Sequence, residues 1–130
     1  MPNWCENIVI VACPDDETKN HILECLRSKD QEICCDLDID EDDKTLNIRC
    51  MTRWKPNFEW LEQCQSEGCY VIAYYWEGGC AFCGKWEDGD DQCYDIKEPS
   101  VDWITKNIPD DIVNEMGLIE MYDEEETLPP

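Results

Sequence analysis

Two cysteines with the spacing of a metal-binding knuckle, Cys80 and Cys83, offer the most familiar chemistry in this sequence. Two thiolates separated by two residues can bind one Zn²⁺, but a structural zinc site needs four ligands. The usual second pair is missing, Cys93 is isolated, and Cys69 or His21 could complete a site only through the fold. We therefore favour the alternative, in which Cys80 and Cys83 are small apolar residues of a hairpin and no cofactor is bound. Zinc held with the help of Cys93 is the competing interpretation.

Alternating aspartates at Asp36, Asp38 and Asp40 resemble the first half of a calcium-binding loop. Such a loop has Gly at its sixth position and Glu at its twelfth. This sequence has Glu41 and Asn47 at those positions, and the register that starts at Asp38 fails as well. Weak surface binding of cations is the most that this pattern predicts.

His21 and Cys25 are four residues apart, so a helix would place them on one face, where a histidine can activate a thiol. A nucleophile of this kind also needs a group that orients the histidine, and a cleft. The sequence shows neither, so we interpret the pair as structural. No G-x-S-x-G motif and no phosphate-binding glycine loop occurs, and an enzyme is not expected.

The balance of charge excludes several classes of partner. The chain of 130 residues carries 32 acidic and 10 basic residues, for a net charge of −22. Binding to a phosphate backbone or to anionic lipid requires Lys and Arg, so neither direct nucleic-acid binding nor membrane binding is expected. Hydrophobic residues make up 42% of the chain, enough for a packed core. The six tryptophans are therefore interpreted as core or protein-interface side chains.

The acidic residues are not spread evenly along the chain. Residues 49–76 carry three acidic and three basic residues, whereas residues 32–48 carry seven acidic residues and one basic residue. Three acidic segments form the candidate partner-binding surface: Asp36, Asp38, Asp40, Glu41, Asp42, Asp43, Glu87, Asp88, Asp90, Asp91, Asp123, Glu124, Glu125 and Glu126.

Hydrophobic patterning predicts the elements that must position these side chains. Four strands are expected, one helix near Pro14 after the first, and another from Pro56 to near Gly68 after the third. The expected strands are residues 4–11, 32–40, 45–51 and 69–76. In the second, apolar and acidic residues alternate, which is typical of a half-buried strand with a wet acidic face.

The order of these elements, β-α-β-β-α-β, predicts an α+β, ferredoxin-like fold, with two helices on one face of an antiparallel sheet. Residues 80–87 and 92–96 are expected to add a hairpin, and residues 101–107 and 109–116 to form short helices. We expect a single domain over residues 1–122 with this C-terminal extension, and an acidic tail over residues 123–130.

Three segments resemble motifs of a family of small ferredoxin-like proteins carried by phages, prophages and plasmids. The opening Met-Pro-Asn-Trp-Cys-Glu-Asn is similar to that family's M-P-N-W-C-x-N start. Residues 52–56 with Trp60-Leu61 resemble its T-x-W-x-P…W-L segment, and residues 77–84 its E-x-G-x-x-F-x-G turn. The resemblance covers about residues 1–87 and implies a fold and a mobile-element setting, but no catalytic residues. Cys80, Cys83 and the extreme acidity are not part of the family pattern.

These features together lead to the hypothesis of a DNA mimic. Carboxylates on alternate positions of a strand stand about 6.7 Å apart, and duplex DNA is likewise a rod of regularly spaced negative charge. We expect the protein to occupy the basic nucleic-acid groove of a host defence protein, such as a CRISPR effector or a restriction enzyme, as an inhibitor. The alternatives are a protein–protein adaptor of another target and a merely solubilising surface. A homodimer would lengthen the anionic surface.

The cysteines and the N-terminus bear on the compartment. No basic segment followed by an apolar signal core begins the chain, and no stretch approaches 18 apolar residues. The 11 cysteines are odd in number, and without an export signal they are interpreted as free thiols. We therefore expect the protein in the cytoplasm of the host cell.

Overall fold

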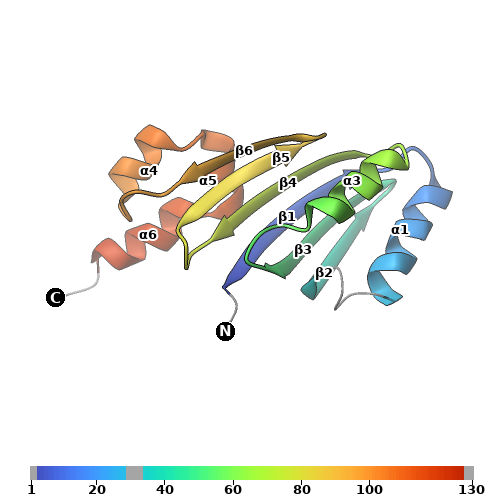
Figure 1. Cartoon of the computed structure of the whole chain (residues 1–130), viewed down its shortest axis with the longest axis horizontal. Helices are drawn as coiled ribbons and strands as arrows, with labels where there is room; N and C mark the ends of the chain where they lie inside the picture. The colour runs from blue at the N-terminus through green and yellow to red at the C-terminus, as the bar shows by residue number, and fades with distance from the viewer. Residues whose placement is uncertain (1–2, 29–33, 128–130) are drawn as a thin grey trace.

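A computed structural model describes residues 3–28 and 34–127, with side chains up to residue 123. It is an α+β structure built on one antiparallel sheet of six strands in the order β2-β3-β1-β4-β5-β6 (Figure 1). The strands are β1 (Trp4–Ala12), β2 (Cys35–Asp42), β3 (Thr45–Arg53), β4 (Tyr70–Glu77), β5 (Phe82–Glu87) and β6 (Asp90–Asp95). The described residues form five helices: α1 (Asp16–Ser28), α3 (Phe58–Ser66), α4 (Val101–Asn107), α5 (Asp110–Met116) and α6 (Leu118–Thr127).

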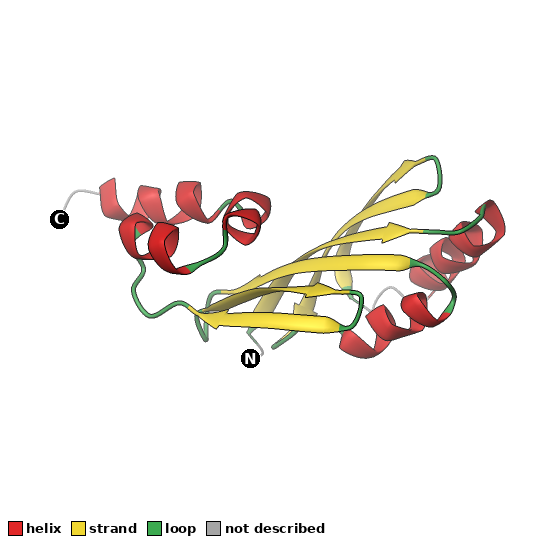
Figure 2. Ribbon diagram, turned by 90° about the horizontal axis from the view of Figure 1, so that it is seen from above, coloured by secondary structure: helices red, strands yellow, loops and turns green. Residues whose placement is uncertain are grey.

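The helices cover both faces of the sheet, in two separate groups. Helices α1 and α3 lie on one face and α4 to α6 on the other, near the opposite end of the molecule (Figure 2). Alternation along the central strand supplies both layers: Val9 and Val11 pack under α1 and α3, while Ile8 and Ile10 pack toward α4 to α6. Each face of the sheet therefore has its own hydrophobic core.

Local signals fix where the elements begin and turn. Asp15 Oδ1 accepts a hydrogen bond from Thr18 N at 2.7 Å ahead of α1, and Asn57 Oδ1 accepts one from Trp60 N at 3.1 Å to cap α3. Two-residue turns join β2 to β3 and β5 to β6, with positive φ at Asp43 (53°) and at the Asp88–Gly89 pair (49° and 102°). Asp and Gly are the residues that tolerate this backbone conformation in tight hairpins.

The predicted α+β class with an antiparallel sheet is confirmed, as are the hairpin of β5 and β6 and the two short helices α4 and α5. The sheet, however, has six strands in one layer, because β5 continues the ladder beyond β4. Helix α6 was not predicted; it extends through Thr127 and so includes much of the segment assigned to an acidic tail. None of the helices within residues 3–28 and 34–127 has the length and hydropathy needed to cross a bilayer.

Candidate functional site

The two acidic turns of the sequence lie at the same end of the sheet. Strand order and register place the turn after Asp42 and the turn after Glu87 at this end, on opposite edges (upper right in Figure 1). The start of α1 joins them, since Cys13 N donates to Lys44 O at 2.9 Å. We call this region the acidic end, and it comprises Asp15, Asp16, Glu17, Glu41, Asp42, Asp43, Glu67, Glu87, Asp88 and Asp90.

A row of carboxylates leads along the edge strand β2 toward the acidic end. Asp38, Asp40 and Asp42 are exposed on one face, while Leu37 and Ile39 alternate with them and pack on the core under α1 and α3. The predicted wet acidic face of this strand is therefore present. Asp36 lies at a bulge with φ of 52°, which breaks the register between Cys35 and Asp38.

Few cations offset this charge. Lys19 Nζ lies 3.5 Å from Glu41 Oε1 and donates to Asp43 O at 2.9 Å, and Arg27 lies 3.7 Å from Glu41. On the other edge, a hydrogen bond from Tyr70, followed by contact with Lys85, lowers the pKa of the Glu87 carboxyl. Among the described side chains, most carboxylates of the acidic end have no ion-pair partner.

Both edge strands of the sheet are acidic, which has a structural consequence. Charged side chains on an edge strand prevent pairing with the edge of another sheet. Asp91 on β6 is also held locally, because its Oδ1 accepts a hydrogen bond from Tyr75 Oη at 2.5 Å. Edge protection explains acids along β2 and β6, but it does not explain those in the turns at the acidic end.

The third acidic segment lies elsewhere. Asp123 is exposed on α6, next to Tyr122, whose hydroxyl accepts a hydrogen bond from Trp76 Nε1 at 3.1 Å. Trp76 is six residues along β4 from Tyr70, about 20 Å at 3.3 Å per residue. Asp123 is thus far from the acidic end; the helix that carries it, α6, lies at the lower left in Figure 1. The side chains of Glu124, Glu125 and Glu126 are outside the described part of the chain.

The cysteines singled out for zinc are not arranged around one point. Cys80 is exposed in the β4–β5 turn, and Cys83 is buried against α4 to α6. Cys93 pairs with Gly84 in the ladder, so its side chain lies on the other face of the sheet from Cys83. Within the described residues, no group of three His, Cys, Asp or Glu side chains is close enough to hold a metal ion. The fold therefore does not bring Cys69 or His21 to this pair.

A chain of three polar side chains joins α1 to α3, and sequence reasoning recognised only two of them. Cys25 Sγ lies 3.7 Å from His21 Nε2, and His21 Nδ1 lies 2.5 Å from Glu67 Oε1. They line a cleft of about 450 Å³ between the two helices. One local feature of the sequence could have drawn attention to Glu67. It is an acidic residue at the negative end of α3, an unfavourable position, and no basic residue in the last turn of that helix compensates for it.

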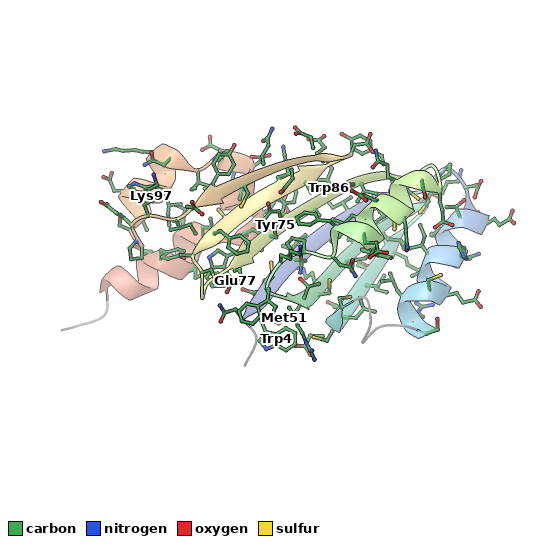
Figure 3. The ribbon with its side chains drawn as sticks, in the orientation of Figure 1. Trp4, Met51, Tyr75, Glu77, Trp86 and Lys97 are labelled. Atoms are coloured by element: carbon green, nitrogen blue, oxygen red, sulfur yellow. The ribbon has the colours of Figure 1, made fainter. Side chains whose placement is uncertain are left out.

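The opposite end of the sheet has a different character. Trp4 and Trp54 are 38% and 52% exposed there, Arg53 lies 5.8 Å over the ring of Trp4, and Lys55 follows. Figure 3 shows Trp4 beside Met51 at this end, and both line a cleft of about 660 Å³. We call Trp4, Arg53, Trp54 and Lys55 the tryptophan end. Trp54 has φ of 68°, an uncommon conformation for a bulky residue.

A buried carboxylate organises the turn beside the tryptophan end. Glu77 is 1% exposed, and its two oxygens accept hydrogen bonds from Gly79 N at 2.7 Å and Cys80 N at 2.8 Å. Asn3 Nδ2 donates to Cys80 Sγ, and Asn3 O accepts from Trp54 N at 2.7 Å. One residue of each of the three motifs, Asn3, Trp54 and Cys80, therefore takes part in these contacts.

Comparison with known protein families, with curated proteins and with solved structures found no match. What the geometry itself defines is a small acidic α+β protein with three distinct surface features. They are the acidic end, the tryptophan end, and the cleft that holds Cys25, His21 and Glu67.

Proposed function

We propose that the protein is an acidic inhibitor that binds the basic nucleic-acid groove of another protein and inhibits it by occupying that groove, without catalysis. The observation that carries this proposal is the gathering of two distant acidic turns and the start of α1 at one end of a rigid sheet. Carboxylates placed in this way can pair with the Arg and Lys side chains that otherwise hold phosphates. They would also steer the protein toward a basic groove and raise the association rate.

The acidic end extends across the full width of the sheet. Strands β2 and β6 are separated by five inter-strand steps, about 24 Å at 4.8 Å each. The row of Asp38, Asp40 and Asp42 extends the charge along one edge at intervals of about 6.7 Å. A sheet holds these positions fixed, so little conformational entropy is lost on binding. Asp123 is on the far side and is not part of the surface that we propose.

The setting of this proposal comes from the fold plan and the motifs. The order β2-β3-β1-β4, with α1 and α3 on one face, supports a ferredoxin-like plan to which β5, β6 and the C-terminal helices are additions. We infer a phage or plasmid origin from the resemblance of the three motifs. The targets that fit are then host defence proteins, such as a CRISPR effector or a restriction enzyme, in the cytoplasm of the host.

The test compares two variants with the same change of charge. Asp38→Asn/Asp40→Asn/Asp42→Asn removes the row, and Glu115→Gln/Glu120→Gln/Asp123→Asn removes three exposed carboxylates on α5 and α6. Immobilised protein is exposed to purified basic nucleic-acid-binding proteins, with duplex DNA as competitor at graded salt. We expect the row variant to associate about tenfold more slowly and the α5–α6 variant to match the wild type. Failure of DNA to compete, or equal loss in both variants, would contradict the proposal.

A second candidate function is supported by the tryptophan end. Exposed tryptophans beside a cation are typical of the centre of a protein–protein interface, and Trp54 is held in a strained backbone conformation. If the protein is an adaptor that binds its partner through Trp4 and Trp54, the affinity for that partner should depend little on ionic strength, unlike binding through the acidic end. A partner protein that is lost from Trp54→Ala, and whose affinity for the wild type does not change with salt, would favour this function over groove mimicry.

A further inference from the structure

We propose that Cys25 is a nucleophilic thiol that takes up acyl groups from small uncharged or cationic esters and thioesters, with His21 as its base and Glu67 as the positioning residue. This site shares only Glu67 with the acidic end of the proposed inhibitor; Cys25 and His21 lie outside that surface. It goes beyond the structural role that the sequence suggested for His21 and Cys25, because the fold supplies the two parts that the sequence did not show: an orienting group and a cleft.

The geometry is that of an activated nucleophile. Cys25 Sγ is 3.7 Å from His21 Nε2, within reach of a sulfur hydrogen bond, and the two residues are four apart on α1. Glu67, from the end of α3, is 2.5 Å from the other ring nitrogen. A thiol, an imidazole and a carboxylate in this order are the arrangement by which enzymes activate cysteine.

Glu67 determines which ring nitrogen can act as the base. A carboxylate only accepts hydrogen bonds, so His21 Nδ1 must carry the proton of the 2.5 Å contact. In the neutral ring, Nε2 is then left with its lone pair directed at Cys25, the tautomer that a general base requires. The backbone of Glu67 is itself fixed, because its N–H bonds to Gln63 O and Cys64 O, both at 3.2 Å, at the end of α3.

The cleft beside Cys25 limits the substrate. Its volume of about 450 Å³ suits a small molecule. Ile22, Trp60 and Cys64 form apolar walls, and Glu59 joins Glu67 at the rim, so an anionic acyl group would be repelled. Gln63 also lines the cleft, one helical turn before Glu67. Its side-chain amide can donate a hydrogen bond to an oxyanion that forms in the cleft.

The reaction balances with water as the only co-reactant. The Cys25 thiol gives its proton to His21 Nε2 as sulfur attacks the carbonyl carbon, and a tetrahedral oxyanion forms. The bond to the leaving alkoxide or thiolate breaks, and His21 returns the proton to that group. Water then attacks the thioester on Cys25, with His21 again as base, and the carboxylic acid leaves as the thiol re-forms.

The other cysteines provide internal controls. Burial raises the pKa of Cys5, Cys69 and Cys83 to about 12, so these thiols do not compete at neutral pH. Cys80 is exposed, and its thiol accepts a hydrogen bond from Asn3 Nδ2 and not from a histidine. If access alone decided reactivity, exposed Cys80 should react faster than half-buried Cys25. A Cys25 thiol that reacts faster than Cys80 would therefore show that His21 activates it.

The first experiment measures alkylation of each cysteine by iodoacetamide at pH 7, read by peptide mass spectrometry. We expect Cys25 to react at least tenfold faster than Cys80, and His21→Gln to reduce its rate to that of Cys80 or lower. A Cys25 rate at or below that of Cys80 in the wild type, or one unchanged by His21→Gln, would overturn the proposal. Unfolding midpoints of both proteins establish that the substitution leaves the fold intact.

The second experiment uses p-nitrophenyl acetate as the acyl donor. We expect an acetyl group on Cys25 and turnover that falls about 100-fold in Cys25→Ser and in His21→Gln, whereas Cys80→Ser retains full activity. Glu67→Gln should lower kcat and leave KM and the unfolding midpoint unchanged; a merely structural role would instead lower the midpoint. Acetylation confined to other residues, or turnover that survives Cys25→Ser, would refute the site. Neutralising Asp38, Asp40 and Asp42 should not change turnover, so this result and that of the groove test are independent.

Discussion

The acidic end and the tryptophan end lie at the two ends of the same strands, yet their carboxylates differ in burial and in hydrogen bonding. At the acidic end, carboxylates are exposed and few have a cation nearby. Beside the tryptophan end, by contrast, the carboxylate of Glu77 is buried and accepts two backbone hydrogen bonds. Exposed like charges oppose folding, whereas a fully hydrogen-bonded buried carboxylate holds a turn in place. The comparison separates charge that maintains this fold from charge available to a partner.

The largest effect is expected for Glu77→Ala. This substitution leaves the N–H groups of Gly79 and Cys80 without their acceptors, so the free energy of unfolding should fall by about 3 kcal/mol. Urea unfolding followed by tryptophan fluorescence measures it. The matched control is Asp42→Ala at the acidic end, which should lose little. Equal losses in the two variants would remove the distinction between the ends.

Trp54→Gly should stabilise the protein by about 1 kcal/mol, although it deletes a large side chain. Trp54 has φ of 68° and is 52% exposed, so glycine relieves backbone strain at little cost in burial. The neighbouring substitution Lys55→Gly serves as the control, because Lys55 does not have a positive φ and should lose stability through the unfolded state. A loss of stability in Trp54→Gly would show that the side chain is structural.

The row variant Asp38→Asn/Asp40→Asn/Asp42→Asn should raise the melting temperature by a few degrees at low salt. The cause is the relief of repulsion among exposed carboxylates on one face of β2. Differential scanning calorimetry at increasing NaCl should show the wild type approaching the variant, because salt screens these charges. A difference that is independent of salt would show that repulsion is not its origin.

The smallest effect is expected for the ion pair of Lys85 and Asp111. Lys85 Nζ donates to Asp111 Oδ2 at 2.6 Å, and this hydrogen bond lowers the pKa of Asp111. A lowered pKa in the folded state stabilises the protein above the ordinary pKa of Asp, and this stability is lost as pH falls through the lowered value. Asp111→Asn should therefore cost about 0.5 kcal/mol at pH 7, since the pair is partly exposed, and progressively less as the pH falls below the ordinary pKa of Asp. Urea unfolding at a series of pH values tests this; a cost that does not decrease with falling pH would contradict it.

Much of the fold could be predicted from local patterns. The alternation of Leu37 and Ile39 with aspartates fixed the face of β2, and the Asp88–Gly89 pair marked a hairpin turn. Helix α6 was missed because its ten residues end in a run of acids with no basic residue in the last turn, a composition that resembles a solvated tail. Packing of Leu118 and Tyr122 against the second core stabilises it instead.

The sites were less predictable, because each joins residues that are distant in the chain. His21 and Cys25 could be paired from their spacing, but Glu67 is 46 residues from His21 and reaches it only through the packing of α3 beside α1. In the same way, the sequence predicted one surface from three acidic segments. Local patterns could not indicate that Asp123 lies far from the other two segments, because their distance depends on the packing of α6.

Residue types and their periods alone determined the anionic character, the α+β class and the acidic face of β2, because each depends on neighbours within a few positions. The tertiary structure alone decided that the turns after Asp42 and Glu87 share one end of the sheet and that a carboxylate orients the only histidine. The physical reason is that strand order and helix packing are set by burial of the two cores, which is a property of the whole chain and not of any segment.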